Sequence, residues 1–283
     1  MTVLVVGGGG REHALCLGLA DSPSIHEIHC APGNAGTAQM ATNHPFTDTT
    51  DLVHLAFQLD VDFVVAGPEG PLCEGLSDLL GKMDIPCFGP VAALARLEGS
   101  KLHAKKVMKA NNIPTAEFHI LDQDSDIETS LDDFSAKPWV VKRDVLAGGK
   151  GVVVTSDREE AMDFILDSIK RDGKVLLEDF LPGEETSILV IMDGLSYVCL
   201  PASQDHKREF EGDKGRNTGG MGAYAPAPCY SAEVEAKTLQ RIVKPIHAYL
   251  SAKRVPYRGV LYIGLMIDEN NDPYVVEFNV RFG

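Results

Sequence analysis

The hydrophobic pattern changes along the chain and divides it into two parts. Up to about residue 90, short unbroken apolar runs such as VLVV (3–6) and FVVA (63–66) alternate with segments of helical periodicity. Unbroken runs are typical of parallel strands that are covered on both faces. The first part is therefore predicted to be a doubly wound α/β domain with a parallel sheet. Its expected strands are 3–6, 25–30, 63–66 and 86–88, and its expected helices are 12–19, 51–59 and 75–83.

After residue 90 the pattern becomes that of an α+β region. A long helical tract over 92–111 is interrupted at Gly99-Ser100, where the serine can cap the second half. We expect an N-terminal domain over 1–100 and a second domain over 101–283, with a small subdomain at about 115–186 and the remainder at 187–283. The further expected elements are strands at 139–142, 152–155, 175–180, 186–192, 197–201, 259–267 and 274–278, helices at 158–170 and 232–252, and a polar, Gly-rich loop over 204–224.

Charge and composition narrow the function classes. With 26 Lys+Arg against 41 Asp+Glu the formal net charge is -15, which opposes a broad binding surface for nucleic acid or for an anionic membrane. The start of the chain lacks a basic leader, and no apolar run approaches ~18 residues, so we expect a cytoplasmic protein. The 6 cysteines are widely spaced without a Cys-x-x-Cys pair, which predicts reduced thiols. These features favour a protein that acts on small molecules.

Four glycines, Gly7 to Gly10, follow the first strand and precede a helix. The dinucleotide fingerprint needs a third glycine where this chain has Glu12, and it needs a carboxylate after the second strand, where this chain has Cys30-Ala31-Pro32. A nicotinamide or flavin site is therefore disfavoured. Two interpretations stay open: backbone N–H groups at the helix N-terminus bind an anion, or the glycines merely allow a tight turn.

A second glycine-rich stretch lies between two predicted strands, in WVVKRDVLAGGKGVVV (139–154). It lacks the spacing and the Ser/Thr of a Walker A loop, and a strand follows it instead of a helix. Such a hairpin can close over nucleotide phosphates, with Lys142 as a fixed charge on the preceding strand; a plain hairpin is the alternative. Next, in LLEDFLPGEETSILV, the backbone of 179–181 can read adenine and Glu185 can accept from ribose hydroxyls, unless these carboxylates simply face solvent.

The last stretch, VVEFNVRFG, carries polar residues at alternate positions. Side chains of a strand alternate between its faces, so Glu277, Asn279 and Arg281 are expected on one face. Two oxygen ligands and a cation on an otherwise apolar strand are costly unless they have partners. Oxygen ligands suit Mg²⁺ or Mn²⁺, which complete their coordination with water and substrate phosphates. A metal site is the favoured interpretation.

Taken together and in this order, these features resemble the ATP-grasp superfamily, and within it the phosphoribosylamine-glycine ligases, also called glycinamide ribonucleotide synthetases. The resemblance extends over the whole chain. It rests on GREHA, APGNAGT, GPEGPL, LEGSK, SQDHKR, NTGGMGAY and EFNVRFG.

The resemblance implies a reaction and its cofactors. ATP, with Mg²⁺ or Mn²⁺, phosphorylates glycine, and the amine of 5-phosphoribosylamine attacks the glycyl phosphate to give glycinamide ribonucleotide, ADP and phosphate in purine biosynthesis. The second domain is then the ATP-grasp domain, 115–186 its flap, and the protein is expected to be a monomer. The residues implied to contact ATP are Lys101, Lys142, Lys150, Glu178, Asp179, Phe180, Leu181 and Glu185.

The same resemblance assigns the other site residues. Glu277 and Asn279 are implied to hold the metal, and Arg281 and Lys207 are the catalytic candidates. The opening glycines are left for the phosphate of phosphoribosylamine, because ATP is placed beneath the flap. The substrate-binding residues implied are Gly9, Gly10, Arg11, Glu12, Asn34, Ala35, Gly36, Thr37, Glu69, Pro71, Asp205, His206, Asn217 and Thr218.

The sequence departs from the family pattern at three places. KRDVLAGGKGV stands where members usually read KADGLAAGKGV, the segment between Arg158 and Glu178 is shorter than usual, and the chain stops at Gly283, where members continue into a further C-terminal domain. These departures leave two alternatives to the ligase: an inactive, truncated nucleotide-binding module, or an ATP-grasp ligase that acts on another carboxylate.

Overall fold

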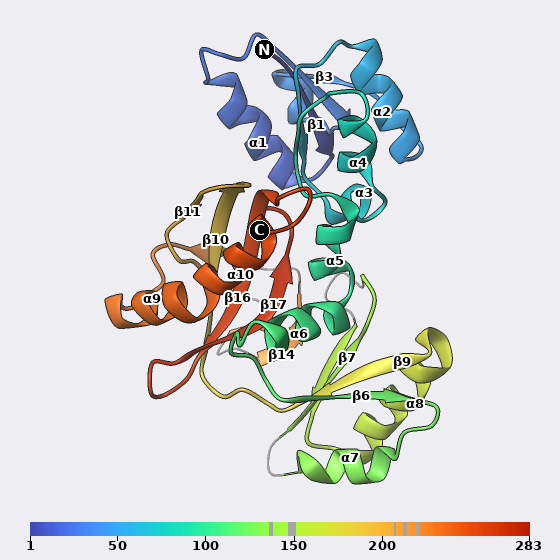
Figure 1. The fold of residues 1–283 in the computed structure, drawn as a ribbon, viewed down its shortest axis with the longest axis vertical. Coiled ribbons are helices and arrows are strands. Elements are labelled where there is room, and N and C mark those ends of the chain that lie inside the picture. Colours follow the sequence, from blue (N-terminus) through green and yellow to red (C-terminus); the bar gives the residue numbers. More distant parts are fainter. Residues whose placement is uncertain (136–137, 147–150, 207, 212–213, 219–220) are drawn as a thin grey trace.

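The protein consists of three bodies that follow one another along the longest axis of the molecule (Figure 1). The computed structural model describes residues 1–283 apart from 136–137, 147–150, 207, 212–213 and 219–220. The N-terminal sheet domain lies at one end, a small subdomain with strands β6 to β9 lies at the other, and a body with a long antiparallel sheet lies between them. Parallel sheet first and antiparallel sheets afterwards is the predicted fold class.

The N-terminal domain is a five-stranded parallel sheet in the order β3-β2-β1-β4-β5. Val3 and Val5 of β1 pack toward α1, whereas Leu4 and Val6 pack toward α2 and α4, so the VLVV run is buried on both faces as predicted. Its elements are β1 Thr2–Gly7, α1 Gly10–Ala20, β2 Glu27–Pro32, β3 Thr42–Asn43, α2 Thr49–Gln58, β4 Phe63–Ala66, α3 Glu69–Cys73, α4 Leu76–Gly81 and β5 Cys87–Phe88.

Two helices then connect this domain to the small subdomain. The expected interruption at Gly99-Ser100 is present, because α5 (Ala92–Gly99) ends there and the Ser100 side chain accepts a hydrogen bond from the His103 amide at the start of α6 (Lys101–Ala110). The subdomain is an antiparallel sheet in the order β6-β9-β7-β8, with a hydrophobic core of its own. Its elements are β6 Phe118–Asp122, α7 Ile127–Asp133, β7 Trp139–Arg143, β8 Val152–Thr155, α8 Arg158–Asp172 and β9 Lys174–Glu178.

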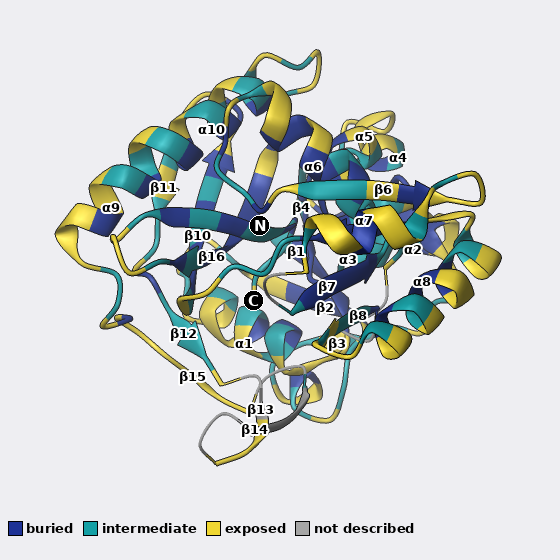
Figure 2. Ribbon diagram, turned by 90° about the horizontal axis from the view of Figure 1, so that it is seen from below, coloured by how far each residue is buried: buried dark blue, intermediate teal, exposed yellow. Residues whose placement is uncertain are grey.

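The central body is built on the antiparallel sheet β11-β10-β16-β17. Its inner face and the N-terminal domain share one hydrophobic core, while the outer faces of α9 and α10 are exposed (Figure 2). The helix predicted over 232–252 is continuous but contains a π-helical turn at Leu239–Val243. The elements are β10 Glu184–Asp193, β11 Tyr197–Cys199, β12 Gln204–Asp205, β13 Arg208–Phe210, β14 Lys214–Asn217, β15 Ala223–Tyr224, α9 Ala232–Thr238, α10 Lys244–Ser251, β16 Arg258–Ile267 and β17 Pro273–Asn279.

Several expected boundaries were wrong. The segment 204–224, predicted as a loop, contains two short ladders, β12-β15 and β13-β14. The helix expected at 75–83 is preceded by a separate helix, α3, and β3, β6 and α7 were not predicted because each is short. Along the described part of the chain, no helix has the length and apolar character needed to cross a membrane.

Candidate active site

Strand β17 brings three polar side chains to one face through a β-bulge. Gly264 lies opposite Glu277 but Leu265 lies opposite Val275, so Val276 is the extra residue. Beyond the bulge, Phe278 and Val280 are buried while the residues between and after them are half-buried. The predicted alternation of Glu277, Asn279 and Arg281 is therefore present, and the bulge resets which face they occupy.

Beneath the small subdomain lies a buried cluster of charged side chains. Glu178, at the end of β9, has one carboxylate oxygen 3.0 Å from Lys142 Nζ on β7 and 3.0 Å from Lys105 Nζ on α6. All three side chains are at least nine-tenths buried, and the second oxygen of Glu178, Oε1, is buried without a hydrogen-bond partner. Lys142 Nζ also donates to the carbonyl of the bulged Val276 at 3.4 Å, which links this cluster to β17, the strand that carries Glu277 and Asn279.

The pKa shifts in this cluster have two causes: burial, and the presence of two lysines beside one carboxylate. Burial lowers the pKa of Lys105 to about 8, although Glu178 opposes that shift. Burial by itself raises the pKa of Glu178, yet Lys142 and Lys105 together hold it below its ordinary value. Two ammonium groups thus share one ionised carboxylate, and the cluster carries an excess of positive charge. An anion placed against it would be strongly favoured.

Lys101 lies close enough to this cluster for the charges to interact. Burial lowers its pKa, Glu277 raises it and Lys142 lowers it further. Its Nζ donates to the Val145 carbonyl at 3.0 Å, so it points to the base of the flap. Asp144 at that base accepts from the Leu102 amide at 2.9 Å and from the Ser100 hydroxyl, and thereby ties the flap to the first turn of α6.

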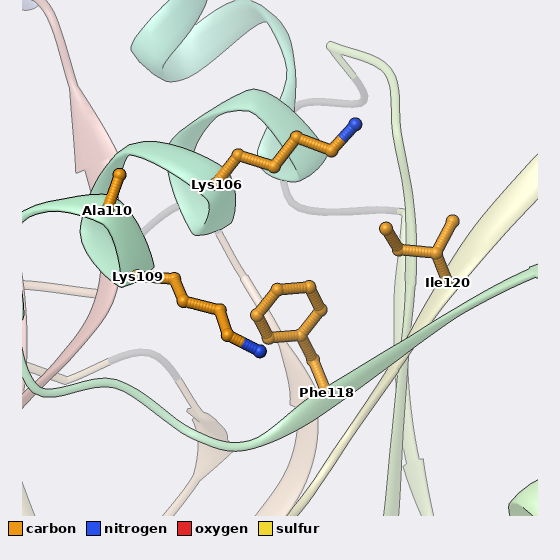
Figure 3. Close-up of a pocket in the computed structure, with 5 residues that line it drawn as sticks. All are labelled: Lys106, Lys109, Ala110, Phe118 and Ile120. Atoms are coloured by element: carbon orange, nitrogen blue, oxygen red, sulfur yellow. The ribbon is translucent and has the colours of Figure 1, made fainter.

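A hollow of about 450 Å³ opens beside the cluster, between α6 and β6 (Figure 3). Lys106 and Lys109 extend over it from the helix, and Phe118 and Ile120 line it from the strand. The Nζ of Lys105 lies 5.5 Å from the centre of the Phe118 ring. Phe118 therefore lines the hollow and lies near Lys105 of the buried cluster.

Arg281, just after β17, contacts side chains of α3 and α5. Its Nε lies 3.2 Å from Glu69 on α3, and its Nη2 lies 3.2 Å from Glu98 on α5 and 3.3 Å from Asn279 Oδ1. Glu69, predicted as a substrate residue near the glycine turn, contacts Arg281 and is also close enough to Arg11 of the turn to oppose the lowering of its pKa by burial.

The glycine turn is closed largely by its own hydrogen bonds. Gly9 is the N-cap of α1, and its amide donates to Glu12 Oε2 at 2.6 Å. Glu12 is buried, and a Cβ at Gly7, where φ is +122°, would come within 2.6 Å of its side chain, so glycine is required there. Arg11 spans the turn by donating to the Gly67 carbonyl at 2.9 Å.

Asn34 fastens the neighbouring loop to this turn. Its amide group donates to the carbonyls of Gly8 and Gly9 at 3.0 and 3.1 Å, and its Oδ1 accepts from the amides of Gly36 and Thr37. The residues predicted from GREHA and APGNAGT therefore do lie together, with Ala35 between the two anchored ends.

The remaining predicted residues are spread over other segments. Pro71 lies within α3, Asp205 ends β12, and the ring of His206 lies 5.5 Å from that of Tyr224. Asp179, Phe180 and Leu181 follow β9, and the Asp179 amide donates to the Glu117 carbonyl. Glu185 and Thr218 each have an interaction partner. Lys150 and Lys207 lie outside the described residues, as does the side chain of Asn217.

Two departures from the family pattern meet in the structure. Arg143, at the base of the flap, forms a bidentate pair with Asp172 at the end of α8, with distances of 2.6 and 3.0 Å. Asp172 belongs to the shortened segment, so both changes are combined in one contact.

The donor set on β17 fits a divalent cation. Within the described ranges no three His, Cys, Asp or Glu side chains converge to hold a metal ion. Glu277 and Asn279 supply two oxygen ligands, and Mg²⁺ commonly takes one or two carboxylates and completes its coordination with water and substrate phosphates. Lys142 of the charged cluster lies next to this strand, since its Nζ donates to the Val276 carbonyl.

Sequence reasoning did not identify two residues of this site. Lys105 and Glu98 lie on the apolar faces of α6 and α5, where their neighbours Leu102, Val107 and Leu97 are buried. A charged residue inside an apolar helical stripe was the available signal, because such a group is buried only with a partner.

Comparison with known proteins yields two matching family models. The N domain of phosphoribosylglycinamide synthetase matches residues 1–98, and the ATP-grasp (A) domain of phosphoribosylglycinamide synthetase matches residues 99–283. Each match falls on one side of the junction between Glu98 and Gly99.

Similar proteins agree with this match. Curated phosphoribosylamine–glycine ligases of Mycobacterium leprae and Ralstonia nicotianae are 45% and 44% identical to this chain, covering 100% of it and 68% and 69% of their own length. The crystal structure of the phosphoribosylamine–glycine ligase of Thermotoga maritima has a TM-score of 0.82 and 34% identity, with coverage of 100% of this chain and 69% of that one. The chain thus spans about two thirds of the length of these relatives.

Proposed function

The chain belongs to the phosphoribosylglycinamide synthetase family, and we propose that it carries out the ligation of glycine to 5-phosphoribosylamine. ATP phosphorylates the glycine carboxylate, and the amine of phosphoribosylamine attacks the glycyl phosphate. The products are glycinamide ribonucleotide, ADP and phosphate, which makes this a step of purine biosynthesis.

The observation that carries the proposal is the buried cluster of Lys105, Lys142 and Glu178, with Lys101 beside it. Its positive charges outnumber its carboxylate, and it lies between the flap and β17. We assign these lysines to the ATP phosphates, where fixed cations neutralise the charge that moves during phosphoryl transfer. Lys150 on the flap is assigned to the same phosphates by its place in the sequence.

The rest of the nucleotide is assigned to the segment that follows β9. The backbone of Asp179, Phe180 and Leu181 is expected to read adenine, and Glu185 on β10 to accept from the ribose hydroxyls. The Glu178 side chain lies 3.0 Å from the ammonium groups of both Lys105 and Lys142, and we assign it to holding these two lysines in position for ATP.

Glu277 and Asn279 would hold Mg²⁺ or Mn²⁺ at the phosphates. When bound, such a cation neutralises phosphate charge and fixes the geometry of transfer. Arg281 projects from the same face and is assigned to the glycine carboxylate or to the charge that develops on it. A flap that closes over this site would exclude water, which a glycyl phosphate requires.

The phosphate of phosphoribosylamine is assigned to the glycine turn, with Gly9, Gly10 and Arg11 as its contacts and Glu69 between the turn and Arg281. The support is that Gly9 is the N-cap of α1 and Gly10 and Arg11 begin this helix, because the backbone amides at a helix N-terminus can bind an anion. The loop residues assigned to glycine and phosphoribosylamine by sequence are Asp205, His206, Lys207, Asn217 and Thr218. We further propose a cytoplasmic monomer.

The test is the release of ADP by the 283-residue chain with Mg²⁺, glycine and freshly generated phosphoribosylamine. Turnover that needs both substrates supports the proposal. Binding of ATP without turnover would leave a nucleotide-binding module, and turnover with another small carboxylic acid in place of glycine would move the specificity. Glu277→Gln is expected to abolish metal-dependent turnover with an unchanged circular-dichroism spectrum, and retained activity would remove Glu277 as a ligand.

A further inference from the structure

The carboxylate of Glu98 contacts two consecutive residues just after β17. Its Oε2 accepts a hydrogen bond from the Val280 amide at 2.7 Å, and its Oε1 lies 3.2 Å from Arg281 Nη2. The side chain is 7% exposed and comes from α5, 182 residues earlier in the sequence. One buried carboxylate therefore fixes both the backbone and the side chain at this point.

Burial of such a group in an apolar stripe is costly and raises the pKa of Glu98 to about 7, although Arg281 and the Val280 amide oppose that shift. Leu94, Ala95 and Leu97 on the same helix are buried in the main core, whereas Glu98 turns to the strand. Charge-assisted hydrogen bonds to a guanidinium and to an amide are the interactions that make a buried carboxylate tolerable. The Glu98 side chain therefore contacts the residues that follow β17 and does not join the apolar packing of α5.

The guanidinium of Arg281 is held from three sides. Glu98 contacts Nη2, Glu69 contacts Nε at 3.2 Å, and the Phe282 carbonyl accepts from Nη1 at 3.1 Å. The Arg281 side chain is only 19% exposed, so these protein contacts, and not water, hold most of the guanidinium. Among the described residues, the other side-chain contact of Nη2 is the 3.3 Å hydrogen bond to Asn279 Oδ1, and this contact would remain without Glu98.

We propose that Glu98 is a positioning residue for the ligation reaction, which holds the Arg281 guanidinium in place at the end of β17. The expected effect of Glu98 on catalysis rests on the proposed function. Its contact with Arg281 does not, because that contact is seen in the structure. Glu98 acts through Arg281, and the contacts of its carboxylate among the described residues are to the Val280 amide and the Arg281 guanidinium.

The neighbouring residues place this role in a wider arrangement. In the segment LEGSK (97–101), Glu98 reaches the strand end, the Ser100 hydroxyl reaches Asp144 at the flap base, and Lys101 reaches the Val145 carbonyl. Three side chains of this five-residue segment therefore contact either the end of β17 or the base of the flap. Phosphoryl transfer is proposed to take place between these two parts. Glu98 is the member that fixes the strand side.

The test compares Glu98→Gln with the parent and with the same change in an Arg281→Lys background. Glutamine keeps an oxygen for the Val280 amide but removes the charge that faces Arg281. The first readout is the Nε–H resonance of Arg281 in [¹⁵N]arginine-labelled protein, assigned by its loss in Arg281→Lys. The second is the kcat and the KM for ATP. Asp272→Asn, which removes the carboxylate that pairs with Arg241 at the other end of β17, is the matched control.

We expect Glu98→Gln to shift or broaden the Arg281 resonance and to lower kcat about 10–100-fold with the KM for ATP within about twofold. In the Arg281→Lys background the same change should lower kcat less than about twofold, and Asp272→Asn should leave both readouts at parental values. Glu98→Asp, which retracts the carboxylate by one methylene, is the second variant if the glutamine protein does not fold, and a partial loss of kcat is expected from it.

Three results would overturn the proposal: an unchanged Arg281 resonance, an unchanged kcat, or an equal loss of kcat in both backgrounds. If the parent shows no turnover at all, the proposed function fails, and the Arg281 resonance still decides whether Glu98 holds the guanidinium.

Discussion

The two regions assigned to phosphate are built on opposite principles. Beneath the flap, Lys105 and Lys142 share one buried carboxylate, whose second oxygen has no hydrogen-bond partner. In the glycine turn, the Gly9 amide already donates a hydrogen bond to Glu12. The Gly8 and Gly9 carbonyls already accept hydrogen bonds from the Asn34 side chain. The first region keeps unbalanced charge for a ligand, and the second uses its polar groups to hold its own shape.

The glycines of the turn permit its backbone conformation, but they contribute no charged side chain that could bind a phosphate. The opening GGGG is the more conspicuous phosphate motif in the sequence, yet the buried cations lie elsewhere. If both assignments hold, we expect phosphate binding at the turn to use the remaining backbone amides and Arg11, and phosphate binding at the lysine cluster to use fixed ammonium groups. The predictions that follow are ordered by the size of the expected effect.

Glu178→Ala is expected to have the largest effect on stability. It leaves two buried lysines without their shared carboxylate, and removal of one partner from a buried ion pair costs about 3–5 kcal/mol. Urea unfolding measures the loss, with Glu128→Ala as the control because that carboxylate is exposed. A loss no greater than that of the control would show that the cluster is not held by Glu178.

The pH dependence of the two regions should also differ. Burial lowers the pKa of Lys105 to about 8 from 10.5, so its ammonium group is lost as the pH rises through about 8. A hydrogen bond to a charged group contributes about 1.5–3 kcal/mol, which predicts a roughly 10–100-fold weaker affinity for ATP above that pH. The KM for phosphoribosylamine should not follow this change. Lys105→Met should abolish the pH step, with Lys106→Met as the control.

The sign for stability is opposite to that for binding. Between about pH 8 and 10.5 the unfolded chain holds a proton on Lys105 that the folded chain has released, so the free energy of unfolding rises with pH in this window. Urea unfolding of the parent against Lys105→Met isolates this contribution. A parent that loses stability relative to Lys105→Met across the window would contradict the burial of a charged Lys105.

Asn34→Ala probes the region that is built for shape. The change removes the donors to the Gly8 and Gly9 carbonyls and the acceptor for the Gly36 and Thr37 amides. Since Asn34 is partly exposed and water can replace some of these bonds, a loss of about 1–2 kcal/mol is expected. The KM for phosphoribosylamine should rise while ATP affinity is kept. An unchanged KM would separate this loop from the substrate.

Much of the fold could be predicted because its strands carry unambiguous patterns. VLVV and FVVA specify buried parallel strands, and the alternation in VVEFNVRFG correctly places three polar side chains on one face. The elements that escaped prediction are short: β3 has two residues, α3 has five, and β6 reads FHILD, in which neither period is clear.

The site was less predictable because its key contacts join distant segments. Nothing near Glu98 in the sequence indicates Arg281, and nothing near Lys105 indicates Glu178. The bulge at Val276, which brings its carbonyl to Lys142, depends on the pairing with Gly264 and Leu265 on another strand. Charged residues inside apolar stripes were the readable sign, but their partners are determined only by the folded chain.

The assignment of two phosphates to two regions is the central claim, and the ATP affinity of Gly9→Val tests it most directly. A valine side chain at this position would press on Glu12, because even a Cβ would lie 3.0 Å from Glu12 Oε2 and disturb the turn. We predict a raised KM for phosphoribosylamine with an ATP dissociation constant within about twofold of the parent. Lys142→Met provides the converse variant. A marked fall in the ATP affinity of Gly9→Val would contradict the account.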